Sequence, residues 1–276
     1  MIFVRRDLQP LFAREGTVDD FLAIEGRPYR EAAGRKTLRF ERDGRGFFIK
    51  CHWGVGWGEI LKNLVSLRLP VLGASNEWRA IWALEELGVD TMRLAAYGEQ
   101  GLNPASRRSF VITDELTDIE SLETWAPRFL QGPQTPARIR LKHALIRKLA
   151  QISRRLHTHG INHRDYYLCH FLLDLSGGEP APERLRLFLI DLHRVQIRRR
   201  TPRRWVVKDV AGLFFSAMDL GLSSRDLFRF MRIYGGGRLR HTLAADRVFW
   251  NRVLRRACKF YREFHGREPR LPRQIR

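Results

Sequence analysis

The chain has 276 residues, of which 44% are hydrophobic and 29% charged, a balance typical of a globular protein with a packed core. Its formal net charge is +20, carried by 43 Arg and 7 Lys against 30 acidic residues. No uncharged apolar run approaches the length of a transmembrane helix, and the first residues lack the apolar core of a signal peptide, so we expect neither. Cys51, Cys169 and Cys258 show no paired spacing, which predicts neither a zinc site nor a disulfide framework and favours a reducing, cytoplasmic location.

The N-terminal part of the chain predicts a small sheet and one helix. Residues 37–51 alternate around Asp43-Gly44, a pattern typical of a β-hairpin. Residues 77–87 form an amphipathic helical run that a glycine closes, and residues 91–97 and 109–116 predict two more strands. A lysine therefore ends one predicted strand and a glutamate opens the predicted helix.

Two further segments lie beside the hairpin. Gly-Arg-Lys-Thr at residues 34–37 is the only candidate for a phosphate-binding loop, and there the cations of Arg35 and Lys36 could replace glycine amides. No Gly-x-Gly-x-x-Gly sequence precedes Lys50. Residues 53–72 mix Trp, Leu, Ile and Val with two cations. That segment could lie on a membrane interface or cover the core, and both interpretations stay open.

From about residue 118 the pattern becomes mainly helical. Residues 142–159 place apolar side chains on one stripe and end at a glycine, which predicts a helix. Residues 171–174 and 185–190 predict a hairpin with a long loop that contains Gly and Pro. Two further helices are expected at residues 206–220 and 246–265, the second basic and amphipathic. These elements predict an α+β fold.

A His-Arg-Asp triplet stands between the long helix and the second hairpin. Followed by a short spacer and an apolar strand, it resembles the catalytic loop of a kinase. There Asp165 would orient the acceptor hydroxyl and take its proton, with His163 and Arg164 beside it. His170 occupies the position five residues later, where protein kinases carry a metal-binding Asn.

Asp191 ends the second strand of the predicted hairpin, as the metal-binding Asp of the kinase Asp-Phe-Gly triplet does. Here the triplet is Asp-Leu-His, so only the carboxylate carries over. The hairpin would bring Asp165 and Asp191 to the same end of a small sheet. Two carboxylates in one cleft are what a Mg-nucleotide site requires. Asp209, further on, could hold the loop backbone as a kinase Asp does, or could be an ordinary helix-terminal charge.

The upstream elements follow kinase order as well. Lys50 resembles the strand lysine that holds the ATP phosphates, and Glu77 resembles its partner on the following helix. The backbone of Asp114, Glu115 and Leu116 corresponds to the hinge that meets adenine. Each residue alone has a plainer explanation, but their joint order favours a two-lobed protein-kinase-like fold. We expect a small β-rich N-lobe at residues 1–116, a mainly helical C-lobe at residues 117–276, and ATP with Mg²⁺ as cofactors.

Three strings narrow the resemblance: the Trp- and Gly-rich run at residues 52–64, Asn-Glu-Trp at residues 76–78, and His-Arg-Asp-Tyr-Tyr-Leu-Cys-His at residues 163–170. Together they resemble the bacterial lipopolysaccharide core heptose kinases, over most of the chain. The resemblance implies ATP-dependent phosphorylation of heptose I of the lipopolysaccharide inner core at the cytoplasmic face of the inner membrane. His170 is then the normal residue of the family. A kinase for protein Tyr or another small acceptor, and a non-catalytic basic protein with a kinase fold, remain alternatives.

The basic residues are concentrated in two segments. Residues 194–204 hold six Arg without an acid, and residues 246–276 hold ten basic residues against three acids. The first cluster would line the acceptor side of the cleft and suit an anionic glycolipid; the alternative is a solvated basic face, with the Arg excess due to codon usage. We also expect peripheral binding to anionic inner-membrane lipid and to an acidic protein, for which acyl carrier protein is a candidate. No nucleic-acid motif is present, so nucleic acid is not an expected partner.

Overall fold

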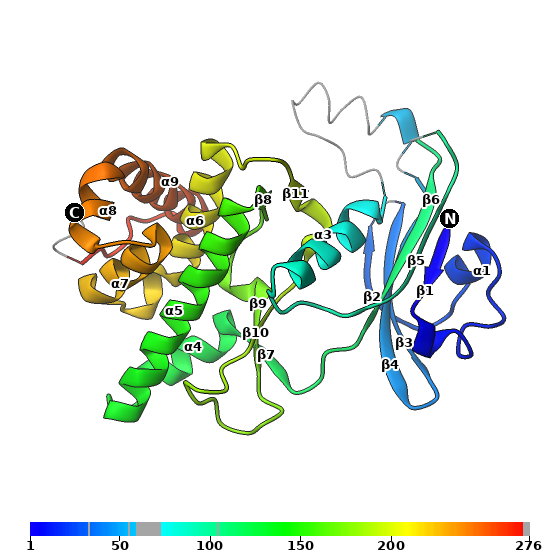
Figure 1. The fold of residues 1–276 in the computed structure, drawn as a ribbon, viewed down its shortest axis with the longest axis horizontal. Coiled ribbons are helices and arrows are strands. Elements are labelled where there is room, and N and C mark those ends of the chain that lie inside the picture. Colours follow the sequence, from blue (N-terminus) through cyan, green and yellow to red (C-terminus); the bar gives the residue numbers. More distant parts are fainter. Residues whose placement is uncertain (33, 55, 59–72, 104, 273–276) are drawn as a thin grey trace. The chain divides into compact units, whose positions relative to one another are not determined.

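The computed structural model describes residues 1–32, 34–54, 56–58, 73–103 and 105–272 (Figure 1). The chain forms two compact units. Unit 1 comprises Met1–Glu85, Met92–Thr117 and Leu192–Arg194, and unit 2 comprises Glu86–Thr91, Asp118–Asp191 and Val195–Arg276. An antiparallel sheet at the N-terminal end is followed by a mostly helical C-terminal part, which confirms the predicted α+β class. The contiguous domains 1–116 and 117–276 stay a prediction.

Unit 1 is built on a six-stranded antiparallel sheet with the order β1-β5-β6-β4-β3-β2 (Figure 1). Its elements are β1 (Ile2–Val4), η1 (Arg6–Leu8), α1 (Val18–Leu22), β2 (Arg27–Ala32), β3 (Arg35–Arg42), β4 (Arg45–His52), α3 (Ser75–Glu86), β5 (Leu94–Gln100), β6 (Arg108–Asp114) and η3 (Leu192–Arg194). The predicted hairpin is confirmed as β3–β4. Asp43 and Gly44 have φ values of 47° and 68°, as expected for the left-handed residues of a two-residue hairpin turn.

The two faces of this sheet bury different groups. Phe21 of α1 stacks on Phe110 of β6 with the ring centroids 4.2 Å apart, inside the main core of the unit. On the other face, Trp78 of α3 stacks on Tyr97 of β5 at 4.3 Å. Side chains alternate along β4, and Ile49 and Cys51 point into the main core, so Lys50 points to the face that carries α3.

Unit 2 combines a helical bundle with two small antiparallel sheets, one ordered β10-β9-β7 and one pairing β11 with β8. Its helices are α4 (Leu122–Gln131), α5 (Pro136–Thr158), η2 (Leu168–His170), α6 (Arg203–Ala217), η4 (Met218–Leu220), α7 (Ser224–Gly235), α8 (Leu239–Ala245) and α9 (Arg247–His265). Its strands are β7 (Ile119–Ser121), β8 (Ile161–Asn162), β9 (Phe171–Asp174), β10 (Leu187–Leu189) and β11 (Gln196–Ile197). The predicted second hairpin is confirmed as β9–β10.

The long helix α5 determines where the following loop begins. It starts at Pro136, six residues before the predicted start. Thr135 is the N-cap, and its side chain accepts a hydrogen bond from the Arg138 amide. The predicted stop at Gly160 is confirmed. Gly160 has a φ of 81°, and a Cβ atom there would lie 1.7 Å from the Arg198 carbonyl oxygen, so only glycine fits.

The three cysteines are free thiols. In the part of the chain that the structure describes, no helix is both long enough and apolar enough to cross a membrane. The open question about residues 53–72 falls largely on positions 55 and 59–72, which lie outside the described residues. Trp53 and Trp57, which are described, are 43% and 56% exposed.

Candidate active site

The His-Arg-Asp segment of unit 2 is held by a buried carboxylate. Asp209, on α6, is 1% exposed and accepts hydrogen bonds from the backbone amides of His163 (2.6 Å) and Arg164 (2.9 Å). A carboxylate that accepts two backbone N–H groups in a dry environment fixes the local backbone. The prediction that Asp209 holds this loop is confirmed, and the alternative of a simple helix-terminal charge is wrong.

Two residues of this region adopt a backbone conformation that side chains usually avoid. Arg164 has a φ of 77° and Asp191 a φ of 62°. Non-glycine residues in this region store strain, which persists only where the surroundings impose it and which gathers at functional sites. The surroundings of Arg164 do so: Lys208 donates a hydrogen bond to its carbonyl, and its guanidinium lies 5.1 Å from the Trp205 ring centroid.

His170 links the two predicted carboxylate positions within unit 2. Its Nδ1 lies 2.6 Å from the backbone carbonyl oxygen of Asp165, and its Nε2 lies 3.4 Å from Oδ2 of Asp191. A carbonyl oxygen only accepts, so Nδ1 carries the hydrogen. Nε2 thus faces the Asp191 carboxylate, and the two groups could act together as ligands of one cation.

The pKa values of His163 and Cys169 are shifted by burial and by nearby charges. Burial lowers the pKa of His163, which is 1% exposed, and its Nε2 lies 3.0 Å from the Ile190 carbonyl oxygen. Burial, together with the charges of Glu123, Asp191 and Asp165, raises the pKa of the Cys169 thiol to about 11. At neutral pH the thiol is therefore protonated and is no nucleophile.

In unit 1 the predicted lysine and glutamate meet. Nζ of Lys50 lies 2.5 Å from Oε1 of Glu77, whose side chain is 2% exposed. This geometry is neither that of a solvated surface lysine nor that of an exposed helix-terminal acid. Nearby, burial and the charges of Arg35, Lys50 and His193 lower the pKa of His52 to about 3, so His52 is neutral among cations.

The segment predicted as a phosphate loop lies where β3 begins. Gly34 is a turn residue with a φ of 71°, and Arg35 and Lys36 belong to strand β3, so a phosphate contact of these two cations stays a prediction. Arg35 pairs with His52 across the ladder, and directly opposed residues share one face of a sheet. Arg35 thus lies on the face of Lys50. Lys36 lies on the other face, with its ammonium 3.3 Å from Glu31.

The predicted adenine hinge is largely occupied by contacts within unit 1. The amide of Asp114 donates to the Arg93 carbonyl and that of Glu115 to the Gly46 carbonyl. The Asp114 carboxylate pairs with Arg5 at 2.9 Å, and the Glu115 carboxylate pairs with Arg39 at 2.7 Å. Of the three predicted residues, the backbone of Leu116 is therefore the best candidate to meet adenine.

Unit 2 also contains an apolar cavity of about 320 Å³ among α5, α6, α7, α8 and α9. Leu168, from the loop between Asp165 and His170, forms part of its wall, with Leu213, Met231 and Trp250. The loop amide of Leu168 is in turn fixed by Ser216 of α6, whose hydroxyl oxygen accepts its hydrogen bond at 3.0 Å. Leu168 thus connects this loop to the apolar cavity.

Comparison with known proteins decides the family. Residues 19–234 match the model of the lipopolysaccharide kinase (Kdo/WaaP) family. The chain belongs to this family. It is similar to the lipopolysaccharide core heptose(I) kinase WaaP of Pseudomonas aeruginosa, with 48% identity over 87% of this chain and 88% of the relative. For the WaaP of Escherichia coli K12 the identity is 45%, over 91% and 93%.

A solved structure described as WaaP in complex with acyl carrier protein matches with a TM-score of 0.80 and 39% identity, over 95% of this chain and 99% of that one. The predicted resemblance to the heptose kinases is confirmed. The Lys50–Glu77 pair of unit 1 and the residues His170 and Asp191 of unit 2 all lie within the residues that match the family model.

Two residues of unit 2 near the Asp209 carboxylate were not predicted from the sequence. His157 of α5 lies 3.5 Å from Asp209, and Tyr234 of α7 lies 2.8 Å from His157. A polar residue on the buried face of the predicted helix was a signal for His157. Tyr234 had none, because it stands 77 residues further along the chain in a region without a motif.

Proposed function

We propose that this chain transfers the γ-phosphoryl group of ATP to heptose I of the lipopolysaccharide inner core. The observation that carries the proposal is its likeness to three heptose(I) kinases, at 43–48% identity over 87–94% of the chain. The chain is a phosphotransferase of lipopolysaccharide core synthesis, and its acceptor is the heptose. We also propose the roles of single residues, the metal and the partners.

Asp165 acts as the group that orients the heptose hydroxyl and accepts its proton while the oxygen attacks the γ-phosphorus and ADP leaves. The support is local. The residues before Asp165 are fixed through Asp209, and its own carbonyl receives the Nδ1–H of His170 at 2.6 Å. His163 and Arg164 position the loop, as their buried and strained conformations indicate.

Lys50 binds the α and β phosphates, with Glu77 holding its ammonium in place. Arg35 adds a second cation on the same face of the sheet, whereas Lys36, on the opposite face, is a weaker candidate for a phosphate contact. The hinge contributes through the backbone of Leu116, with Asp114 and Glu115 anchoring it to arginines. Positioning and charge neutralisation of this kind supply most of the catalysis in phosphoryl transfer.

Asp191 and His170 are the proposed metal ligands. The hard carboxylate oxygen of Asp191 suits Mg²⁺, which completes its shell with phosphate oxygens and water. His170 offers only Nε2, since Nδ1 is engaged, and an imidazole suits Mg²⁺ less well than an oxygen does. Among the described residues no group of three or more His, Cys, Asp or Glu side chains could hold a metal ion. Bound Mg²⁺ would neutralise developing charge on the transferred phosphate.

The test uses purified protein, ATP with Mg²⁺, and a lipid A–core acceptor that carries inner-core heptose without phosphate. We expect one phosphate on heptose I, located by mass analysis of the inner core. Asp165→Asn is the matched control, and its turnover should fall by about 10²–10⁴-fold, as for loss of an acid–base group. Transfer to Tyr-containing peptides in place of the glycolipid, or no transfer with either acceptor, would contradict the proposal.

We place this reaction at the cytoplasmic face of the inner membrane, where ATP and the nascent core meet, and propose acyl carrier protein as a partner. The solved relative is described as a complex with acyl carrier protein. An acidic carrier suits a chain of net charge +20, and the apolar cavity of about 320 Å³ suits its acyl chain. This cavity lies inside unit 2 and is lined mainly by apolar side chains.

A comparison of acylated with unacylated acyl carrier protein separates the contribution of charge from that of the acyl chain in the cavity. The acylated form should bind more tightly, and Ala217→Trp, which fills the cavity, should remove that difference. Ala244→Trp, at an exposed position of α8, is the matched control. Equal affinity for both carrier forms in the wild type would show that the cavity takes no acyl chain.

A further inference from the structure

The basic segment at residues 196–205 borders the start of the catalytic loop within unit 2. Its strand β11 pairs with β8, the strand that leads into the His-Arg-Asp triplet. The Thr201 hydroxyl donates a hydrogen bond to the Ile161 carbonyl of that strand. Further along, the Trp205 ring lies 5.1 Å from the Arg164 guanidinium. The arginines of this segment have no role in the mechanism proposed above.

One of these arginines, Arg198, is held by two neutral side chains. Its Nη1 donates to Oδ1 of Asn162 at 2.8 Å, and its Nη2 donates to Oε1 of Gln196 at 2.7 Å. Asn162 is fully buried, and its amide nitrogen donates to the same Gln196 oxygen at 3.4 Å. A guanidinium only donates, so both amides present their oxygen to it. These three side chains form a ring of hydrogen bonds that fixes the orientation of the guanidinium.

The ring leaves the positive charge of Arg198 uncompensated. Both hydrogen-bond partners are neutral, and no ion pair with an acid is recorded for Arg198 among the described residues. Its side chain is only partly exposed. A cation withdrawn from water ordinarily has an acidic partner, as Arg5 has in Asp114 at 2.9 Å. A guanidinium also has more N–H groups than two amides accept, so Arg198 can bind an anion without releasing the ring.

We propose that Arg198 binds an anionic group of the glycolipid acceptor, either a carboxylate of an acidic sugar or a phosphate. This inference rests on the proposed function. Both groups present two oxygens that match the planar fork of an arginine. Asn162, which holds the guanidinium, stands three residues before Asp165, so the Cα atoms of these two residues lie at most about 11 Å apart. An anionic group on a neighbouring sugar would thus be held while the heptose hydroxyl lies at Asp165.

Two substitutions of Arg198 test this contact. Arg198→Gln removes the charge, and we expect the KM for the glycolipid to rise by about tenfold to a hundredfold, as for loss of hydrogen bonds to a charged group. The KM for ATP should not change, because the nucleotide contacts are elsewhere. Arg198→Lys keeps the charge but lacks the fork, so it should recover only part of the loss.

Arg200→Gln is the matched control. Arg200 belongs to the same basic segment and is exposed, and no hydrogen bond or ion pair of its side chain is recorded in the described part of the chain. Its substitution removes the same charge and should raise the KM for the glycolipid much less than Arg198→Gln does. Equal effects of the two substitutions would assign the segment to general attraction and overturn the inference.

The carboxylate and the phosphate are distinguished by the acceptor. The glycolipid is used intact, with its sugar carboxylates reduced to alcohols, or with its phosphates removed. The group that Arg198 binds is the one whose removal weakens binding to the wild type, and with that acceptor Arg198→Gln should cause no further loss. If Arg198→Gln weakens the binding of all three acceptors equally, Arg198 contacts neither group and the inference is overturned.

A second readout does not depend on phosphoryl transfer. Binding of the three acceptors in detergent micelles, without nucleotide, should show the same order of affinities for wild type, Arg198→Gln and Arg200→Gln. A wild type that binds the glycolipid but transfers no phosphate would contradict the proposed function. In that case the comparison of Arg198→Gln with Arg200→Gln would still decide whether Arg198 binds an anion of the glycolipid.

Discussion

Glu77 illustrates how a single buried charge depends on its partner. Its side chain is 2% exposed, Oε1 lies 2.5 Å from the Lys50 ammonium, and Oε2 has no hydrogen-bond partner among the described residues. Removing one member of such a pair leaves an uncompensated charge in a dry environment. Substitution of Lys50 therefore has two separable effects, one on the fold of unit 1 and one on the proposed phosphate site.

A double-mutant experiment separates these effects. Lys50→Met should lower the stability of the protein by about 3 kcal/mol, at the low end for a buried pair because the lysine is partly exposed. Adding Glu77→Gln should restore most of that stability and none of the affinity for ATP. Urea unfolding measures the stability, and nucleotide titration measures the affinity for ATP, of the wild type, the two single variants and the double variant. Recovery of ATP affinity in the double variant would mean that Lys50 serves only to neutralise Glu77.

Asp191 allows a prediction about the metal alone. Asp191→Asn keeps the size of the side chain but removes the charge that faces Nε2 of His170 at 3.4 Å. We expect weaker binding of Mg-ATP and unchanged binding of ATP in the presence of a chelator. Asp174→Asn, on β9 and engaged with Ser176, is a control of equal charge loss. If Asp191→Asn weakens both forms of the nucleotide equally, Asp191 is no metal ligand.

Local sequence signals were enough to predict the helices and the hairpins. The pairing of strands that lie far apart in the sequence could not be predicted in this way. The Asp43-Gly44 turn fixed the β3–β4 hairpin, and Gly160 fixed the end of α5, because each residue has a φ that few others tolerate. The pairing of β1 with β5 joins residues about ninety positions apart and has no local signature. The Lys50–Glu77 contact was predicted by resemblance to kinases, whereas periodicity alone placed the two residues only on a strand and a helix.

Two features had no local signal in the sequence. The strand β3 continues through Arg35 and Lys36 because both pair with β4, so the cations that suggested a loop are split between two faces. His157 of α5 lies close to Tyr234 of α7 and to Asp209 of α6, and such polar contacts between helices have no sequence period. Thr135-Pro136 was a readable signal for the early start of α5, since a capping residue before proline typically opens a helix.

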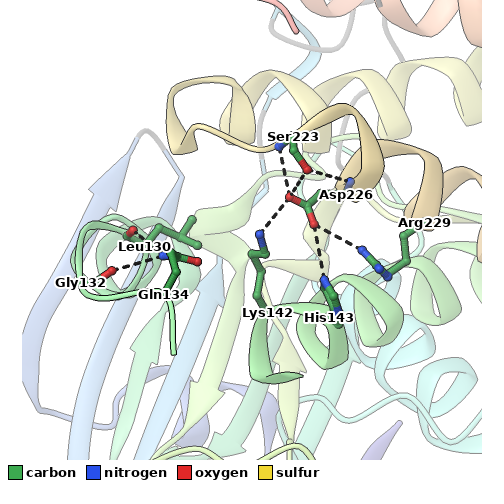
Figure 2. A network of polar contacts seen from close by, with 8 residues as sticks. All are labelled: Leu130, Gly132, Gln134, Lys142, His143, Ser223, Asp226 and Arg229. Carbon is green, nitrogen blue, oxygen red and sulfur yellow. Dashed lines mark hydrogen bonds and ion pairs between the residues drawn. The ribbon is translucent and has the colours of Figure 1, made fainter. Parts of the chain in front are cut away.

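Packing of α7 on α5 includes a buried ionic cluster (Figure 2). Asp226 opens α7 in a capping box with Ser223, and its carboxylate also meets Lys142 of α5 at 3.0 Å and Arg229 at 3.4 Å. His143 adds a nitrogen at 3.9 Å. Burial alone would raise the pKa of Asp226, but hydrogen bonds from Ser223 and Lys142 outweigh it and hold the pKa below the ordinary 3.8.

This lowered pKa predicts a pH-dependent stability. Because the folded state binds the Asp226 proton less tightly than the unfolded chain, the carboxylate stabilises the fold above its ordinary pKa, and this contribution is lost as the pH falls through the lowered value. Asp226→Asn should cost about 2 kcal/mol at pH 7, as for hydrogen bonds to a charged group, and progressively less in acid. Urea unfolding of both proteins across a pH series measures the difference.

A second capping box provides the control for that experiment. Asp20 caps α1 with Thr17 in the same way but lies exposed, and no ion pair with a cation is recorded for it among the described residues. Asp20→Asn should therefore cost less than Asp226→Asn at pH 7. Equal costs would assign the effect to helix capping alone and remove the contribution of Lys142 and Arg229. A cost for Asp226→Asn that does not change with pH would contradict the pKa argument.

Across the whole molecule the surplus of positive charge exceeds what one acceptor requires. The net charge is +20, and many acids are already paired inside their units, as Asp90 is with Arg186 and Lys148. The solvent side of α9 carries exposed cations without an equal number of acids, while its other side packs through Phe249, Trp250 and Val253. Such a helix can lie against an anionic surface without leaving its core contacts.

We expect reversible, salt-sensitive binding to vesicles that contain anionic lipid and little binding to neutral ones. Each basic residue near an anionic surface contributes about 1 kcal/mol, so replacing Arg252, Arg255 and Arg256 of α9 with Gln should weaken binding by about a hundredfold. The control replaces three exposed arginines of unit 1, Arg6, Arg14 and Arg27, and changes the net charge equally. Because the Debye length shortens from about 8 Å at physiological salt to about 3 Å at 1 M, co-sedimentation across a salt series should show the loss of vesicle binding directly.

Equal weakening of vesicle binding in both triple variants would assign the attraction to net charge alone and exclude α9 as the contact. Binding that salt leaves unchanged would exclude electrostatic attachment.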